Sequence, residues 1–158
     1  TVDFAASLNG WVADSATTVV VGSPNPEGSR LIKASEEALA AGIAAAQPGA
    51  KMGDISHAIG EVARSHGLKV NLEFGGHGVG HTMHEDPHVA NDGRPGRGVK
   101  LQPGLVSAIE PWFMSTTNVL RTDRDGWTLR SADGSLTAHS EHTVAITPEG
   151  PLVLTARD

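Results

Sequence analysis

A glycine-rich segment at the centre of the chain, residues 75–89, constrains the fold more than any other. It reads GGHGVGHTMHEDPHV and contains four of the eight histidines. Each of its four glycines costs a helix about 0.8 to 1 kcal/mol relative to alanine. Pro87 removes a backbone donor and disfavours the α region at Asp86. The segment is therefore predicted to be extended or looped, and helical spacing cannot be used to pair its histidines.

The same segment contains a literal match to a signature of zinc proteases. His84 to His88 reads HEDPH, and H-E-x-x-H binds zinc because its two histidines lie one turn apart on a helix. Pro87 falls inside the motif and is incompatible with that helix. The match is therefore interpreted as false, and Glu85 is not the expected catalytic base.

Composition is typical of one globular domain that lacks thiol ligands. The 158 residues are 39% apolar and 19% charged, enough for a single core. The net charge of -6 argues against a nucleic-acid-binding surface. No apolar run reaches the roughly 18 residues of a membrane helix, and no signal-peptide pattern begins the chain. The absence of cysteine fits a cytoplasmic protein and leaves Asp, Glu and His as metal ligands.

The order of the expected elements indicates an α+β fold. Asn9-Gly10 is a strong signal for a hairpin turn between strands at 2–8 and 11–22. Helices are expected from Pro26 to about residue 46 and from about residue 52 to 66, with glycines just beyond their ends. Further strands are expected at 70–74, 105–110, 113–120, 127–130, 137–146 and 152–154. One domain spanning residues 1–158 follows.

The hairpin register brings two aspartates onto one face. A two-residue loop pairs Asp3 with Ala16 and Asp14 with Ala5. Paired residues share a face, so Asp3 and Asp14 become diagonal neighbours roughly 7 to 8 Å apart. Their carboxylates can then reach one ion, although a solvated role for each aspartate is the alternative.

Two glutamates lie in or beside apolar strands. Glu110 closes LVSAIE immediately before Pro111. Glu141 lies in TAHSEHTVAI, where alternation places His139, Glu141 and Thr143 on one face. A strand-end or exposed charge is the alternative for each glutamate, so the inference of a metal site rests on the whole set of acids and histidines.

Five separated motifs then occur in a recognisable order. They are LNGWVAD between the two aspartates, GGHGVG followed by MHEDPHVAN, LQPGLVSAIEPW, DGWTLRSADGS and EHTVAIT. In this order they resemble the type I methionine aminopeptidases, metallopeptidases of family M24 with the pita-bread fold. The resemblance covers essentially the whole chain. It implies a curved antiparallel sheet with two long helices on its outer face.

The resemblance also implies roles for particular residues. Glu110 is the expected proton acceptor, and His84 is expected to contact the substrate amide and stabilise the transition state. Met83 and Trp127 are expected near the substrate, although a core position is an equal alternative for Trp127. His81 and His88 are expected to be structural or peripheral. The implied metal ligands are Asp3, Asp14, His77, Glu110 and Glu141.

The activity implied by the resemblance is removal of the N-terminal methionine from nascent proteins and peptides. Two divalent ions, Co, Mn, Fe or Zn, would share a hydroxide that attacks the first peptide bond. The expected partners are the N-terminal methionine of nascent polypeptides and the ribosome. No nucleic-acid substrate or membrane partner is expected.

The chain departs from the family pattern at its start and near the site. Only Thr1 and Val2 precede Asp3, so the domain is expected to be N-terminally incomplete, with the missing segment of the same protein as a partner. These 158 residues alone are expected to be inactive or poorly active. Met83 stands where the family commonly has phenylalanine, and Ala108 where it often has threonine.

Two other functions are kept as alternatives. An Xaa-Pro aminopeptidase or prolidase shares the fold and the GHG and HE motifs, but usually carries R-x-E-D where this chain has AHSEHT. A non-catalytic pita-bread module that binds peptides or proteins is the other alternative. Such modules typically lose metal ligands, whereas all five are present here.

Overall fold

The chain begins with the predicted antiparallel hairpin. In the computed structural model, which describes residues 1–157, β1 (Val2–Leu8) pairs with β2 (Trp11–Thr17) in the predicted register. Asn9 and Gly10 have φ values of 52° and 82°, the positive values that a two-residue hairpin turn requires. The prediction of a second strand as far as residue 22 was wrong. Beyond β2 the side chain of Thr18, rather than a strand ladder, bonds the backbone of His139.

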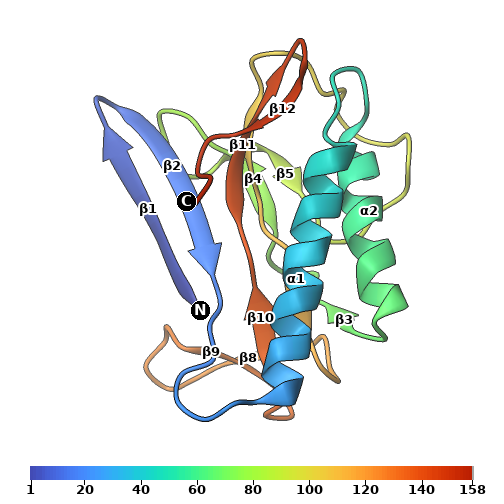
Figure 1. Cartoon of the computed structure of the whole chain (residues 1–158). Helices are drawn as coiled ribbons and strands as arrows, with labels where there is room; N and C mark the ends of the chain where they lie inside the picture. The colour runs from blue at the N-terminus through green and yellow to red at the C-terminus, as the bar shows by residue number, and fades with distance from the viewer. Residues whose placement is uncertain (158) are drawn as a thin grey trace.

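Both helices are confirmed within one residue of their predicted ends. α1 (Pro26–Ala45) is capped by the side chain of Asn25, which accepts a hydrogen bond of 3.0 Å from the Gly28 amide. α2 (Met52–Ser65) ends just before Gly67, which has a φ of 64°. The two helices lie side by side (Figure 1). Among residues 1–157, neither helix combines the length and apolar character that a membrane crossing requires.

Within residues 1–157, the strands other than β1 and β2 form two larger antiparallel sheets and a small hairpin. One sheet has the order β12 (Gly150–Val153), β11 (His142–Thr147), β6 (Val106–Ile109), β4 (Gly76–Gly78) and β5 (Glu85–Val89). The other has the order β10 (Thr137–His139), β7 (Trp112–Met114) and β3 (Lys69–Val70). β8 (Leu120–Thr122) pairs only with β9 (Leu129–Ser131) within the described residues. The extended structure of β4 and β5 confirms that HEDPH is not helical.

Several predicted strands are shorter than expected, for local reasons. The strand at 70–74 stops at Val70, because the Asn71 side chain accepts hydrogen bonds from the amides of Glu73 and Phe74 and so forms a turn. The strand at 113–120 is divided between β7 and β8. The predicted strands at 127–130 and 152–154 correspond to β9 and β12 with shifted ends.

Two strand interruptions matter for the site. Residues 105–110 were expected to be a strand, but β6 ends at Ile109 and Glu110-Pro111 separate it from β7. The strand predicted at 137–146 is broken between β10 and β11. At that break the Ser140 amide donates to Pro111 O at 3.3 Å and the Glu141 amide donates to Ala16 O at 3.0 Å. Glu110 and Glu141 therefore lie side by side where one sheet passes into the other.

The helices and the hairpin lie on opposite sides of these strands. Figure 1 shows β10 and β11 between the hairpin and α1. The helices bury their apolar faces against the strands, and this burial forms the core. The fully or nearly fully buried core side chains include Leu31, Ile55, Ile59, Val89, Leu101, Ile109, Phe113 and Val144.

The hairpin is fastened to β11 by one buried hydroxyl. Thr143 Oγ1 donates to the Asp14 carbonyl at 2.8 Å and accepts from the Asp14 amide at 2.9 Å. Thr143 is fully buried, so both groups depend on this side chain. The pair of bonds fixes the backbone that carries the Asp14 carboxylate.

Replacing Thr143 with valine should destabilise the fold by about 1 to 3 kcal/mol, because both backbone groups of Asp14 lose their partner without gaining water. Chemical denaturation monitored by circular dichroism measures this loss. Thr143→Ser retains the hydroxyl and should recover most of the difference. Equal losses in the two variants would show that the hydroxyl is not the anchor.

Candidate metal centre

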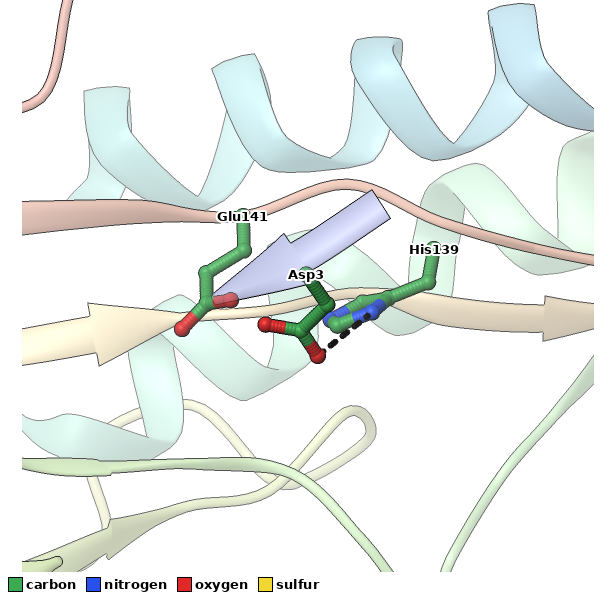
Figure 2. Close-up of side chains that lie close together, drawn as sticks. All are labelled: Asp3, His139 and Glu141. Carbon is green, nitrogen blue, oxygen red and sulfur yellow. Dashed lines mark ion pairs between the residues drawn. The ribbon is translucent and has the colours of Figure 1, made fainter. Parts of the chain in front are cut away.

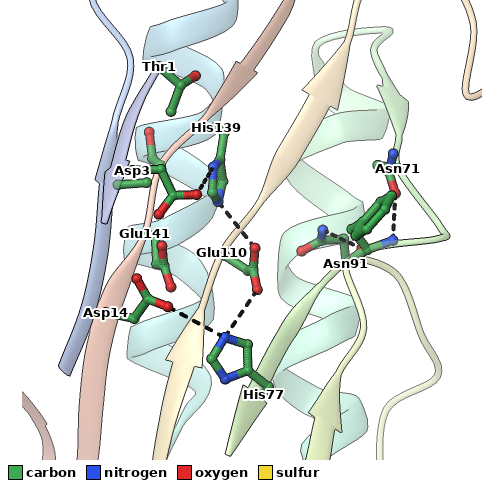
Figure 3. Close-up of polar contacts among 12 residues, drawn as sticks. Thr1, Asp3, Asp14, Asn71, His77, Asn91, Glu110, His139 and Glu141 are labelled. Carbon is green, nitrogen blue, oxygen red and sulfur yellow. Dashed lines mark hydrogen bonds and ion pairs between the residues drawn. The ribbon is translucent and has the colours of Figure 1, made fainter. Parts of the chain in front are cut away.

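The structure brings all five predicted ligands into one cluster and adds a sixth residue, His139. They come from the hairpin, from β4 and from the two strand interruptions (Figure 3). Two groups of three have potential ligand atoms within 4.8 Å of one another. These are Asp14, His77 and Glu141, and Asp3, His139 and Glu141. Glu141 belongs to both groups, so the cluster contains two adjoining sets of ligands.

His77 is held between glycines that let neighbouring strands approach closely. A Cβ atom at Gly76 would overlap the Ala108 carbonyl, and one at Gly78 would overlap the Asp86 carbonyl. His77 Nδ1 lies 3.0 Å from the Gly78 carbonyl. Because a carbonyl only accepts, we assign the proton to Nδ1. This tautomer leaves Nε2 as the free ligand atom.

Glu110 lies between the two imidazoles. Its Oε1 lies 3.8 Å from His77 Nε2, and its Oε2 lies 3.3 Å from His139 Nε2. His77 Nε2 also lies 3.9 Å from Asp14 Oδ2. Figure 3 shows these pairs as a continuous series through the cluster. Each oxygen of Glu110 therefore faces a different set of ligands.

Glu141 is the most deeply buried acid of the cluster, with 2% of its surface exposed. Burial, and then the charges of Glu110, Asp14 and Asp3, raise its pKa from 4.5 to about 9. The pKa of Asp3 is also raised, chiefly by burial, although His139 opposes the shift. A guanidinium group lies nearby, because Arg157 donates to Ser15 Oγ and Ala16 O. The protein thus gathers acidic groups around a buried position, where the neutral form of Glu141 is favoured.

The donor set fits divalent cations. Four carboxylates and two imidazoles are ligands for Mn, Fe, Co or Zn and require no thiolate. His139 Nε2 is buried and finds no hydrogen-bond partner within residues 1–157, as expected of a nitrogen whose partner is an ion. Cations between these groups would offset the repulsion among the acids, which adds to burial in raising the pKa of Glu141.

Part of the cluster lines a cavity of about 860 Å³, within the range of small-ligand sites. Asp3, His77, Glu110 and His139 line it, whereas Asp14 and Glu141 do not. Apolar surface comes from other lining residues, among them Phe74, Trp112 and Leu129. The cavity therefore offers polar groups and an apolar surface to one ligand.

The predicted substrate residues divide into two groups. His84 lines the cavity, and its ring centroid lies 4.4 Å from that of His77. Met83 and Trp127 do not line it. Trp127 is 89% exposed and lies in the turn between β8 and β9, where its amide and that of Thr128 bond the Asp125 side chain. Of these three residues, only His84 lines the cavity.

The other two histidines of the central segment lie at the edges of the site. His81 bonds the Gly10 carbonyl through Nδ1 at 2.7 Å, and its ring lies 4.0 Å from that of Trp11. It joins the central segment to the hairpin turn. His88 is exposed at the rim of the cavity. Both positions agree with structural or peripheral roles.

Sequence reasoning did not name several residues of the site. His139 was placed on the face of Glu141 but was not proposed as a ligand. Phe74 and Trp112 had no signal of their own, because residues far apart in the chain form the cavity. For His139 the signal was its spacing of two from Glu141, which places both side chains on one side of an extended chain.

Comparison with protein families gives one match that spans most of the chain. The sequence profile of metallopeptidase family M24 matches residues 1–148. A methionine aminopeptidase of Aquifex aeolicus is 46% identical over 98% of this chain and 60% of its own length. Methionine aminopeptidase 1 of Bacillus subtilis is 41% identical over 98% of the chain and 62% of its own length. The chain spans about 60% of these curated relatives.

Solved structures give the same fold. The crystal structure of a methionine aminopeptidase from Thermotoga maritima superposes with a TM-score of 0.95 at 40% identity, over 98% of this chain and 62% of that one. A prolidase from Pyrococcus furiosus has a TM-score of 0.77 at 26% identity, over 99% of this chain and 40% of that one. The fold is thus the pita-bread fold, with its helices on one face of the sheet.

Burial and charge crowding at Glu141 predict how the stability of the metal-free protein depends on pH. Its pKa rises from 4.5 to about 9 on folding, so the fold loses stability as pH increases through that interval. Glu141→Gln should flatten this part of the profile. Thermal melts in a chelator across the interval measure the effect. Added Co²⁺ should raise the melting temperature of the wild type more than that of the variant. If the two proteins lose stability with pH in parallel, the raised pKa of Glu141 is not the cause.

Proposed function

Because this chain belongs to metallopeptidase family M24, we propose that residues 1–158 form the catalytic domain of an aminopeptidase. Its reaction is removal of the N-terminal methionine from polypeptides. The observation that carries the proposal is the cluster of four acids and two histidines, four of which line a cavity. The proteins named methionine aminopeptidase that match nearly all of the chain support the choice of substrate.

The family implies dependence on divalent metal ions, and two ions fit the two adjoining sets of ligands. Asp14 and His77 would hold one ion, and Asp3 the other, with Glu110 and Glu141 shared between them. Co, Mn, Fe and Zn all suit these ligands. Ions bound there supply Lewis-acid polarisation of a peptide carbonyl and lower the pKa of water. Both the number of ions and their identity are part of the proposal.

Glu110 is proposed to move the proton of the reaction. Its carboxylate lines the cavity and lies between the two imidazoles, so it can reach both the attacking water and the leaving amine. It accepts a proton from water as the water attacks the carbonyl carbon, and then passes that proton to the amine nitrogen. The peptide C–N bond breaks in that step.

His84 is proposed to position the substrate. Its ring lies at the wall of the cavity beside His77, where it can donate a hydrogen bond to the peptide oxygen. A donor that strengthens as charge develops contributes a few kcal/mol in comparable sites. Met83 and Trp127 are also proposed substrate contacts, on the resemblance alone. Neither residue lines the cavity.

The free amine of the substrate accounts for cleavage at the chain end. Asp3 is half-exposed in the cavity wall, so a cationic amine meets carboxylates as soon as it enters. Phe74, Trp112 and Leu129 offer an apolar surface for a side chain such as that of methionine. Nascent polypeptides leaving the ribosome are the proposed substrates, and the cytoplasm is the proposed location.

The prolidase function is the second candidate, and it is less favoured. The prolidase of Pyrococcus furiosus shares the fold at 26% identity, against 46% for the methionine aminopeptidase of Aquifex aeolicus. The chain also has AHSEHT where those enzymes usually have an arginine. A non-catalytic module is disfavoured because the complete ligand set is present.

The test uses the complete gene product with peptides of the type Met-Ala-Ser and each divalent metal added singly. Release of free methionine is expected with at least one metal. Glu110→Gln should lower kcat by about 100-fold or more, the contribution of a positioned acid or base. Amino-acid analysis of the released product measures both rates.

Two control substrates separate the candidate functions. N-acetyl-Met-Ala-Ser lacks the free amine and should not be cleaved. A Met-Pro dipeptide, by contrast, is the substrate that a prolidase should prefer. Failure to release methionine under any metal would overturn the enzymatic proposal, and a preference for the proline dipeptide would favour prolidase.

A further inference from the structure

We propose that His139 is a sixth metal ligand, which supplies an imidazole to the ion position formed with Asp3 and Glu141. This inference rests on the metal centre of the proposed function and not on its substrate. The resemblance implies only one histidine ligand, His77. His139 would give the second position a nitrogen donor of its own.

The geometry of the second triad supports direct ligation. Asp3, His139 and Glu141 each offer one ligand atom, and these atoms lie within 4.8 Å of one another. His139 Nδ1 lies 3.8 Å from Asp3 Oδ2. Figure 2 shows the Asp3 carboxylate between the His139 ring and the Glu141 carboxylate. Such a separation is too long for a hydrogen bond, so Asp3 and His139 do not bond each other directly and both remain available to an ion.

The His139 ring is buried, and its Nε2 has no hydrogen-bond partner in the described part of the chain. His139 is 8% exposed, and its Nε2 finds no hydrogen-bond partner within residues 1–157. Glu110 Oε2 lies 3.3 Å away, but the pair does not have hydrogen-bond geometry. An unpaired buried nitrogen costs free energy, so its position calls for a bound partner.

The backbone of His139 is held firmly. Its amide donates to Thr18 Oγ1 at 3.0 Å, and its carbonyl accepts from the same hydroxyl at 2.7 Å. The Trp112 ring packs beside the imidazole, with centroids 6.1 Å apart. These contacts fix the ring at the break between β10 and β11, as a ligand position requires.

With His139 included, the two ion positions become equivalent in type. Each has one aspartate of the hairpin, one imidazole and a share of Glu141, and each faces one oxygen of Glu110. Nitrogen ligands suit Zn, Co and Fe, whereas Mg and Ca prefer oxygen alone. His139 should therefore bias the second position toward transition metals.

Cobalt binding provides the test, and it does not depend on turnover. The complete gene product is titrated with Co²⁺ by calorimetry, and the loaded protein is studied by proton NMR. A histidine bound to Co²⁺ gives a strongly shifted, solvent-exchangeable signal from its other ring N–H. The wild type should bind two ions and give one such signal from His77 and one from His139. A single signal with both ions bound would overturn the proposal.

His139→Gln distinguishes a ligand from a residue that only positions Glu110. Glutamine can still donate a hydrogen bond to Glu110, so a positioning role predicts that binding of both ions persists. Ligation predicts that affinity for the second ion falls by at least about tenfold, a loss seen even when outer partners of ligands are removed. One exchangeable signal should vanish while that of His77 remains.

His88→Gln is the matched control, because it removes an imidazole that lines the same cavity but belongs to neither triad. It should leave both affinities and both signals unchanged.

If His139→Gln does not fold, the count of signals in the wild type still decides the question. Absence of any bound ion in the wild type would overturn both this inference and the metal centre, whereas two ions without methionine release would overturn only the proposed function.

Discussion

The repulsion among four carboxylates is the constraint on which the rest of the structure depends. Asp3, Asp14, Glu110 and Glu141 converge in one place, where burial first and the neighbouring acids second raise the pKa of Glu141 to about 9. Like charges do not gather in a water-poor region unless the surrounding packing holds them. The helices supply that packing by burying their apolar faces against the strands. Divalent ions would repay the cost by neutralising the acids, so stability and metal binding are coupled in this fold.

Breaks between strands position two of the acids, Glu110 and Glu141. Glu110 and Glu141 each occupy a position where one sheet gives way to the next, and their neighbours Pro111 and Ser140 bond to each other across the gap. A side chain at such a break is free of the strict alternation of a continuous strand. The hairpin then closes over the break, because the hydroxyl of Thr143 fastens the backbone of Asp14. Backbone irregularity and buried hydrogen bonds together position the ligands.

The hairpin and the two helices could be predicted because local residue preferences determine them. The turn at Asn9 and Gly10 requires positive φ values that few other residues adopt, so it set the hairpin register and the shared face of Asp3 and Asp14. Both helices have apolar residues at helical spacing and typical residues at their ends, and these features do not depend on the tertiary structure. The strands were predicted less well, since their ends depend on partners far along the chain. Beyond the end of β2, for example, Thr18 bonds the backbone of His139, which is distant in the sequence.

By itself, the sequence determined the fold class, the hairpin, both helices, the exclusion of a helical zinc motif and the set of acids worth considering, because short-range sterics and residue spacing control each of these. Only the tertiary structure decided that His139 joins Asp3 and Glu141, that His84 faces the cavity and that Trp127 does not. These outcomes depend on how the hairpin, the central segment and the strand breaks pack in space. Spacing along a chain can place a side chain on a face, but only packing decides what lies opposite that face.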